Sequence, residues 1–298
     1  MPTAPPLPRR PPPASARALL RRAGTALLHG LLPTSCALCG AACAETLCAP
    51  CTAQFFGSAG DGGVVVGAGQ GRTPGDGGPC DAGLDDGTDR AGASGIGCPG
   101  MALRCRQCAN PLPAGAGAGL CAGCLLQPPA FDATVVAADY AMPLDQLVLQ
   151  LKFGHRLAHA ALFARLLRDA VLQQPDFVLP AVLCPVPLGP RRLAERGFNQ
   201  ALEIARPLAR ALGVTLVPRL ACRVHDTQAQ SSVAPDQRGR NVAHAFAIAD
   251  PALVEGRHIG IVDDVMTSGQ TLNELAATFK RYGAARVSNL VFARTPPH

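Results

Sequence analysis

The chain has 298 residues, a formal net charge of +6 and a hydrophobic content of 48%. The length suits one large or two modest domains, and the mild basicity suits a phosphorylated ligand without by itself indicating nucleic acid. No apolar run reaches the roughly 18 residues of a membrane-spanning helix, and we find no secretory signal, so we expect a cytoplasmic protein without a membrane span.

The first 32 residues consist of two segments that differ in composition. Residues 1–14 are rich in Pro and Arg, which predicts a disordered, basic arm. Residues 15–32 carry apolar side chains at helical spacing behind Ser15, a suitable N-cap, and predict an amphipathic helix. We expect this helix to pack on the module that follows. A transit peptide and a membrane-surface helix are the alternatives, because residues 1–30 contain five Arg and no acid.

Eight of the 13 cysteines form four C-x-x-C pairs within residues 33–130. Two residues between cysteines let both sulfurs reach one tetrahedral ion, and two such turns complete a Cys₄ site. A thioredoxin-like redox site would instead need one such pair on a βαβ unit. Taken in chain order, the pairs predict two structural zinc ions, one held by Cys36, Cys39, Cys48 and Cys51, the other by Cys105, Cys108, Cys121 and Cys124. A crossed pairing of the four turns is the alternative.

A stretch rich in Gly and Asp, at about residues 57–100, interrupts this cysteine module. It has almost no large apolar residue outside Val64–Val66, so burial cannot offset the entropy of ordering it. We therefore predict a disordered insertion. Its segment GAGQG (67–71) precedes no helix, which argues against a nucleotide-binding glycine loop.

From about Phe131 the pattern becomes that of an α/β domain, residues 131–298. Strands alternating with helices indicate a mainly parallel sheet, whose ligands bind at the carboxyl ends of the strands. The predicted strands are 133–139, 181–186, 214–220, 258–264 and 286–293, and the predicted helices are 142–153, 156–173, 200–212 and 271–282.

Two adjacent acids, Asp263 and Asp264, end one predicted strand within IVDDVMTSGQT. The start of the next helix offers a phosphate free backbone N–H groups and a favourable dipole, and paired carboxylates suit neighbouring ribose hydroxyls. The stretch therefore predicts a ribose 5-phosphate site. An acid pair that binds only Mg²⁺ is the alternative. The loop residues expected to bind the phosphate are Thr267, Ser268, Gly269, Gln270 and Thr271.

This stretch resembles the phosphoribosyl pyrophosphate (PRPP) loop of type I phosphoribosyltransferases. Together with the cysteine pairs, three further segments resemble the ComF family: YAMPLDQLVLQLKFGHR (140–156), CPVPLGPRRLAERGFNQ (184–200) and TQAQSSVAPDQRGRNVAHAF (227–246). That family, associated with bacterial competence and DNA uptake, joins a double zinc ribbon to a phosphoribosyltransferase-like domain. The resemblance covers about residues 31–295 except the insertion. It implies an α/β fold of phosphoribosyltransferase type behind a small zinc-ribbon module, with PRPP and Mg²⁺ as ligands.

Basic residues near a second strand end are candidates for binding pyrophosphate. Arg191, Arg192 and Arg196 offer the forked hydrogen bonds that suit phosphate oxygens. Lys152, one of only two lysines, is a further candidate. A solvated basic loop and a solvated helix residue are the respective alternatives. Residues 238–241 are expected in a hood over the ligand.

A catalytic domain of this kind would carry out displacement at the anomeric carbon of the ribose. Asp263 and Asp264 would then be the catalytic carboxylates, and Mg²⁺ would stabilise the departing pyrophosphate. The sequence identifies no acceptor. The alternative is a non-catalytic ligand sensor or adaptor whose ribbon binds a protein, such as a DNA-processing partner, or single-stranded DNA. Because residues 31–130 are net acidic, we expect DNA contacts from the basic arm rather than from the ribbon.

Overall fold

The computed structural model describes residues 35–56, 103–113, 119–224 and 245–296. The chain divides into two compact units, residues 1–48 and 49–298. No helix in the described part of the chain is long and apolar enough to cross a membrane. Several predicted features lie outside the described residues: the arm (1–14), the amphipathic helix (15–32), the Gly-rich insertion (57–100) and residues 238–241.

Each cysteine segment combines a tight turn with a short helix. An isolated bridge closes the turn in both, between Ser35 and Ala42 in the first segment and between Arg104 and Pro111 in the second. The first segment ends in helix α2 (Ala49–Phe56), and the second in α3 (Ala122–Leu126).

A five-stranded sheet in the order β1-β7-β6-β2-β3 forms the centre of the α/β domain. All neighbouring strands are parallel, which confirms the predicted sheet. The two central strands are buried along nearly their whole length, as expected for strands covered on both faces. The strands are β1 (Ala133–Asp139), β2 (Val182–Pro185), β3 (Thr215–Leu216), β6 (His258–Met266) and β7 (Arg286–Arg294).

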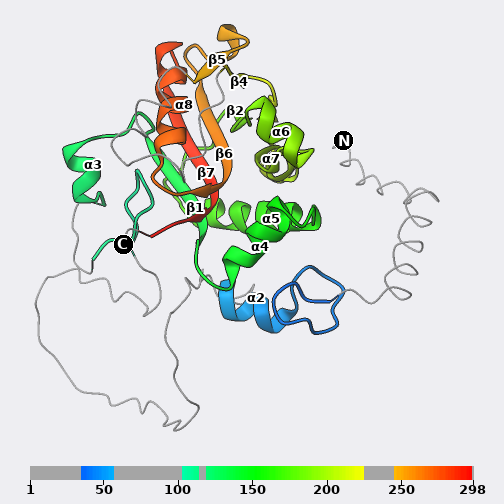
Figure 1. Ribbon diagram of the computed structural model, residues 1–298. Helices are drawn as coiled ribbons and strands as arrows, with labels where there is room; N and C mark the ends of the chain where they lie inside the picture. Colours follow the sequence, from blue (N-terminus) through cyan, green and yellow to red (C-terminus); the bar gives the residue numbers. More distant parts are fainter. Residues whose placement is uncertain (1–34, 57–102, 114–118, 225–244, 297–298) are drawn as a thin grey trace, which may run out of the picture. The chain divides into compact units, whose positions relative to one another are not determined.

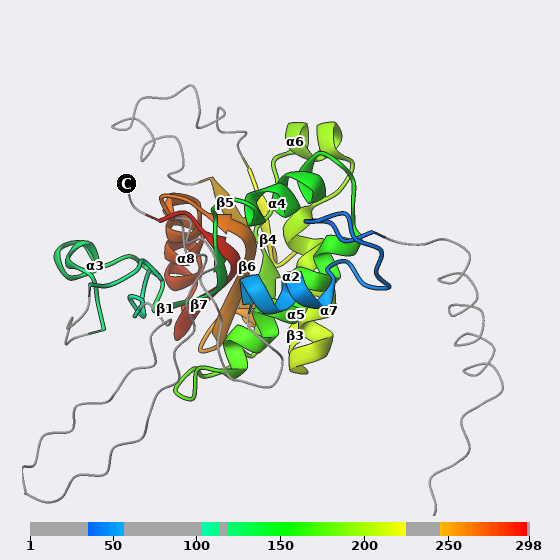
Figure 2. The same cartoon turned by 90° about the horizontal axis from the view of Figure 1, so that it is seen from below.

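Helices cover both faces of this sheet. On one face lie α5 (Ala158–Leu172) and α7 (Gln200–Leu212), with α4 (Leu144–Lys152) packed against α5. On the other face lies α8 (Gln270–Arg281), as Figures 1 and 2 show. Each helix buries one apolar stripe, which in α8 includes Leu272, Leu275 and Phe279.

The core between α5 and the sheet contains a stacked aromatic pair. The rings of Phe163 in α5 and Phe292 in β7 lie with centroids 3.6 Å apart at an angle of 8°, and both side chains are fully buried. Aromatic rings bury large areas, so this pair fixes α5 against the central strands.

The predicted element bounds mostly agree with the structure, with two larger differences in the chain after β2. Residues 214–220 were expected to form one strand, but only β3 forms, because Pro218 has no N–H to extend the ladder. The basic segment after β2 was not predicted to be helical, yet it forms α6 (Pro190–Arg196). Pro190 occupies the first helical turn, and Gly197, with φ +74°, ends the helix.

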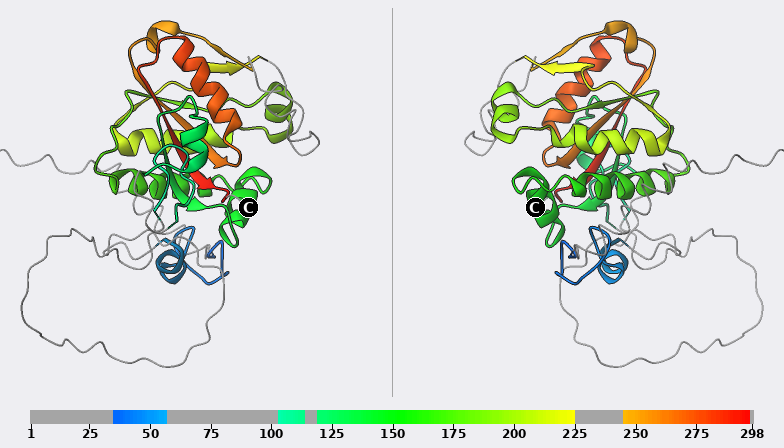
Figure 3. Two further views of the ribbon diagram at one scale, coloured as in Figure 1. Left: turned by 90° about the vertical axis from the view of Figure 1, so that its left-hand side faces the viewer. Right: turned by 90° about the vertical axis from the view of Figure 1, so that its right-hand side faces the viewer.

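A short antiparallel pair lies beside the main sheet. It consists of β4 (Ala221–Arg223) and β5 (Phe246–Ile248), and residues 225–244 between them lie outside the described residues. β5 packs against α8, which can be followed at the top of the views in Figure 3. A 3₁₀ turn, η2 (Pro251–Leu253), then leads into β6.

The second cysteine segment shares the hydrophobic core of the domain. Cys105, Cys108 and Cys124 belong to the same buried cluster as apolar residues of α8 and β7. The segment also pairs with the outer edge of β1, because Thr134 donates its backbone N–H to the carbonyl oxygen of Arg106 at 3.0 Å. The edge strand of the sheet is thereby covered in part.

Candidate functional site

The loop after β6 is shaped by one glycine. β6 continues two residues beyond its predicted end, to Met266, and Gly269 then adopts φ +79° immediately before α8. This left-handed conformation favours glycine, and a Cβ here would lie 2.6 Å from Cε of Met266. The hydroxyl of Ser268 accepts a weak hydrogen bond of 3.5 Å from the N–H of Gln270. The N-terminus of α8 therefore lies directly at the end of this loop.

One cavity of about 270 Å³ gathers most of the predicted ligand residues. It lies at the carboxyl end of β6, and its walls come from α4, α6 and the loop before α8. The predicted residues that line it are Lys152, Arg192, Arg196, Asp263, Asp264, Thr267, Ser268, Gly269, Gln270 and Thr271.

Arg191 lies outside this group. Its side chain is 81% exposed, and its Nε lies 2.9 Å from Oε1 of Glu195 on the same helix. The helix explains the difference, since Arg192 and Arg196 are four residues apart and share a face, which Arg191 does not.

Asp264, the second residue of the acid pair, forms a buried ion pair with Lys152. Nζ of Lys152 lies 2.7 Å from Oδ2 of Asp264, whose side chain is 3% exposed. Removal from solvent, and then the neighbouring charge of Asp264, raise the pKa of Asp263 well above its ordinary value. The Asp264 N–H donates to Oδ1 of Asp263 at 2.9 Å. The free protein thus favours one negative charge on the pair, and Lys152 balances it.

Gln200 connects the basic helix to the acid pair and was not predicted as a site residue. Its carbonyl accepts from Nη1 of Arg196 at 2.9 Å, and its Nε2 lies 3.4 Å from Oδ1 of Asp264. Gln200 is buried at the first position of α7, where Asn199 caps the helix. Its place at a capped helix start beside a strand end was the only sequence signal for this role.

Tyr140 and Arg223 also line the cavity and were not predicted. Tyr140 directly follows β1, and Arg223 lies on β4, which the antiparallel pair brings to this edge of the sheet. The segment after β2 is held in place by Asn199, whose Nδ2 donates to the carbonyl oxygen of Val186 at 3.0 Å.

Aromatic rings lie next to the cationic side of the cavity. The guanidinium carbon of Arg196 lies 5.3 Å from the ring centroid of Phe153, which is 65% exposed. The rings of His155 and Phe198 form a second contact, with centroids 5.8 Å apart. Phe153 and His155 belong to the segment directly after Lys152, and these rings lie outside the lining of the cavity. The sequence alone indicated no base-binding feature here.

The eight paired cysteines form two compact clusters. Within each cluster the four sulfurs lie within 4.8 Å of one another, and the grouping follows chain order rather than the crossed alternative. Cys39 and Cys48 bring their sulfurs to 3.6 Å, and Cys108 and Cys121 to 3.5 Å. A tetrahedral zinc ion with Zn–S bonds of about 2.3 Å needs sulfurs about 3.8 Å apart, so both donor sets fit zinc.

Two of these thiols have lowered pKa values. Burial raises the pKa of Cys36, but hydrogen bonds from the backbone of Cys39 and Cys48 outweigh it and lower the pKa to about 6. Burial is likewise outweighed at Cys105, where backbone hydrogen bonds lower the pKa to about 7. Thiolates are the form that binds zinc, so each cluster contains a sulfur prepared for it.

Comparison with known proteins gives one domain match and several close relatives. Residues 199–297 match the family model of the phosphoribosyl transferase domain. DNA utilization protein YhgH of Salmonella typhi is 41% identical over 194 residues, which cover 64% of this chain and 84% of that protein. Competence protein F of Haemophilus influenzae is 32% identical over 178 residues, which cover 58% of this chain and 78% of that protein.

Among solved structures, similarity is found to glutamine PRPP amidotransferase from B. subtilis, with a TM-score of 0.30 and 18% identity over 44% of this chain and 25% of that one. A similarity of this size carries no argument. The domain match and the parallel sheet together confirm the predicted phosphoribosyltransferase-type fold.

Proposed function

This chain belongs to the ComF family, and we propose that its α/β domain binds PRPP with Mg²⁺ in the cavity at the end of β6, as part of competence or DNA utilization. One observation carries the proposal: two acids, a phosphate-type loop and four basic side chains, drawn from four separate segments, line a single cavity.

Each part of the ligand has a suitable partner. The 5-phosphate would bind residues 267–271, where backbone N–H groups meet the start of α8. The ribose hydroxyls would donate to Asp263 and Asp264. The pyrophosphate would lie toward Arg192, Arg196 and Lys152. Carboxylates and phosphate oxygens are the hard ligands that Mg²⁺ prefers, and the ion would neutralise part of the pyrophosphate charge.

Binding would exchange the partners of the acid pair. In the free protein Lys152 neutralises Asp264. A bound sugar would supply hydroxyl donors to both carboxylates, and the pyrophosphate would attract the ammonium group of Lys152. The raised pKa of Asp263 means that ionising it costs free energy, which the cation and the hydroxyl donors of the ligand would offset.

For a transferase, the reaction would be displacement at C1 of the ribose. The C1–O bond breaks with its electron pair leaving on pyrophosphate, a lone pair of the acceptor forms the new bond, and the acceptor proton goes to solvent. Asp263 and Asp264 would favour the positive charge that develops on the sugar. Phe153 and Phe198 would offer stacking surfaces to a planar acceptor.

A non-catalytic sensor or adaptor is the second candidate. The packing of the second cysteine segment in the core of the domain favours it, because the state of the ligand site would then reach a surface that a protein or single-stranded DNA could contact. Such a protein would bind PRPP through the same cavity without releasing pyrophosphate.

Calorimetric titration of PRPP with Mg²⁺ tests the shared part of both candidates. We expect one site per chain, and we expect ribose 5-phosphate and pyrophosphate each to bind more weakly than PRPP. Arg191→Ala is the matched control, because this exposed residue lies outside the cavity. Arg192→Ala should weaken PRPP more than ribose 5-phosphate. Equal effects of Arg191→Ala and Arg192→Ala would contradict the assignment.

Pyrophosphate release then separates the two candidates. The assay would use PRPP, Mg²⁺ and a panel of nucleobases, with single-stranded DNA as an additional acceptor. Release that depends on one acceptor and disappears in Asp263→Asn identifies a transferase. Tight PRPP binding without release identifies a sensor.

A further inference from the structure

Gln200 lies between a positive and a negative group of the ligand cavity, and its side chain is buried. Its Oε1 accepts from Nη1 of Arg196 at 2.9 Å, and its Nε2 lies 3.4 Å from Oδ1 of Asp264. A neutral amide offers an acceptor on one side and donors on the other. Reversing it would turn the oxygen toward Asp264 and the donors toward Arg196, and both charges oppose this. The orientation of the amide is therefore fixed.

The backbone that carries Gln200 is also held in place. Gln200 is the first residue of α7, and Oδ1 of Asn199 accepts from the N–H groups of Ala201 at 3.0 Å and Leu202 at 3.4 Å. Nδ2 of the same Asn199 donates to the carbonyl oxygen of Val186 at 3.0 Å. This cap joins the start of α7 to the segment after β2, so the fold sets the position of Gln200 before any ligand binds.

Arg196 is held by two contacts. Nη1 donates to Gln200, and the guanidinium carbon lies 5.3 Å from the ring centroid of Phe153, where a cation is attracted to the ring. Within the part of the chain that the structure describes, Arg196 forms no ion pair. A guanidinium has five N–H donors, so most of them remain for a ligand in the cavity that Arg196 lines.

The charge of Arg196 is suited to a phosphate rather than to the acid pair. Lys152 already neutralises Asp264, at 2.7 Å. Removal from solvent lowers the pKa of Arg196, although the charge of Asp264 opposes this lowering. Phosphate oxygens would offset the cost of the buried charge through forked hydrogen bonds. A direct ion pair of Arg196 with Asp264 would instead occupy both the guanidinium donors and the carboxylate, and the amide of Gln200 lies between them.

We propose that Gln200 positions Arg196 for the pyrophosphate of PRPP and keeps it apart from Asp264, so that the site selects PRPP over ribose 5-phosphate. This inference rests on the proposed function, since it assigns a further residue to the same cavity. Gln200 is a positioning residue, because it acts through the guanidinium of Arg196.

The two hydrogen bonds of Gln200 differ in length, which decides where the loss of its amide has an effect. The contact with Arg196 is short at 2.9 Å, and the contact with Asp264 is long at 3.4 Å. Asp264 also keeps Lys152 as a partner. Removing the amide therefore releases Arg196 and leaves in place the carboxylate that would bind the ribose. Affinity for PRPP should fall much more than affinity for ribose 5-phosphate, which has no pyrophosphate.

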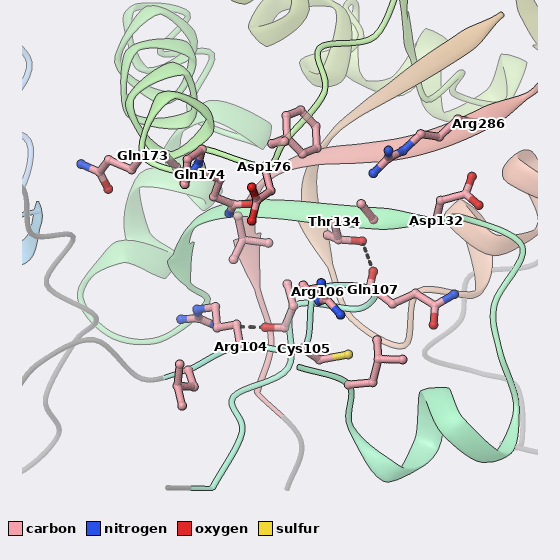
Figure 4. Close-up of a pocket in the computed structure, with 18 residues that line it drawn as sticks. Arg104, Cys105, Arg106, Gln107, Asp132, Thr134, Gln173, Gln174, Asp176 and Arg286 are labelled. Carbon is pink, nitrogen blue, oxygen red and sulfur yellow. Dashed lines mark hydrogen bonds between the residues drawn. The ribbon is translucent and has the colours of Figure 1, made fainter. Parts of the chain in front are cut away.

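Gln200→Met tests the proposal, because methionine has a similar length and cannot replace the hydrogen bonds. Calorimetric titration without an acceptor compares PRPP, with Mg²⁺, and ribose 5-phosphate. We expect Gln200→Met to weaken PRPP about tenfold and ribose 5-phosphate less than about threefold. Gln173→Met is the matched control and should change neither. This exposed glutamine lies beside a separate cavity of about 670 Å³ at the amino ends of β1 and β7 (Figure 4).

A double-mutant cycle with Arg196→Ala shows whether Gln200 acts through Arg196. Arg196→Ala alone should weaken PRPP at least about tenfold. In that background Gln200→Met should have an effect of less than about twofold, because no guanidinium remains to be positioned. Additive effects, or equal weakening of both ligands by Gln200→Met, refute the role of Gln200 in a protein that binds PRPP. If wild type does not bind PRPP, the proposed function fails and this inference fails with it.

A second variant keeps the test decisive if Gln200→Met does not fold, which zinc content and unfolding temperature reveal. Phe153 is 65% exposed, so Phe153→Leu should fold as wild type does while it removes the ring that contacts Arg196. We expect about two- to fivefold weaker PRPP binding and unchanged ribose 5-phosphate binding. Unchanged PRPP affinity in this variant overturns the proposal, because the hold on Arg196 would then not matter for the pyrophosphate.

Discussion

Arg294 donates from Nε to the carbonyl oxygen of Cys108 at 3.1 Å, and so joins the end of β7 to the second cysteine cluster. The same guanidinium donates from Nη1 to the carbonyl oxygens of Met266, Thr267 and Thr295. Arg294 is only 6% exposed. One buried cation therefore fixes both a residue of the predicted zinc site and the first residues of the predicted phosphate loop.

Replacing Arg294 by Met should destabilise the domain strongly. The carbonyl oxygens of Cys108 and Met266 would lose a charged donor, and hydrogen bonds to charged groups contribute about 1.5–3 kcal/mol each. We expect the free energy of unfolding to fall by about 3 kcal/mol or more, measured by chemical denaturation. Arg257→Met, at an exposed position, is the control and should change it little. Equal stability of the two variants would show that the Arg294 contacts contribute nothing.

Metal content should follow the cysteine clusters. Protein purified without added metal should contain about two zinc ions, measured by elemental analysis. Cys48→Ser and Cys121→Ser should each lose one ion, while Cys222→Ser, at an exposed thiol outside both clusters, should retain both.

Cys121→Ser should also lower the unfolding temperature of the α/β domain, because zinc binding contributes to folding where the cluster shares the core. A metal-free protein with the same fold and stability as the purified form would contradict this.

The acid pair should make stability depend on pH. Unfolded, Asp263 ionises near 3.8, and folding raises its pKa well above that value. The folded state therefore binds the proton more tightly, so this contribution to stability is fully present below the unfolded pKa and is lost as pH rises through the folded pKa.

Asp263→Asn should accordingly stabilise the free protein at alkaline pH. The amide carries no charge, so it avoids the burial and the repulsion by Asp264 that disfavour ionised Asp263. Thermal unfolding at acidic and alkaline pH tests this expectation. The proteins compared are wild type, Asp263→Asn and the exposed control Glu255→Gln. If the variant is less stable than wild type at alkaline pH, ionisation of Asp263 does not lower the stability of the folded protein.

The two lysines provide a matched test of charge at the site. Lys152 pairs with Asp264 and lowers the pKa of Asp263, so Lys152→Met should raise that pKa further. We expect the pH at which PRPP binding is half-maximal to move upward, and affinity at neutral pH to fall at least tenfold. Lys280→Met, which affects the ion pair with Asp132 at the other end of the sheet, should do neither.

The periodic elements and the loop could be predicted from the sequence because their signals are local. The bounds predicted for the strand 133–139 and the helix 200–212 are those of β1 and α7. Each is marked within its own residues, the strand by a continuous apolar run and the helix by the Asn199 cap and a closing Gly213.

The sequence did not predict helix α6, so it could not predict which side of that helix faces the cavity. Without a helical phase, three arginines in one short segment are equivalent candidates. With it, Arg192 and Arg196 fall on one face and Arg191 on another. Gln200 and Arg223 were missed for a different reason, since their places at the cavity depend on how distant strands pair.

The order of strands in the sheet also bears on how the protein is made. β7 lies between β1 and β6, although it follows both in the sequence, and β1 pairs with no other strand of the main sheet. On a ribosome that adds about 5–20 residues per second, β1 therefore waits roughly 8–30 s for its partner. During that interval the edge of β1 that later pairs with β7 stays without its neighbouring strand. Nascent chains of this protein should accordingly be clients of ribosome-associated chaperones until β7 emerges from the exit tunnel.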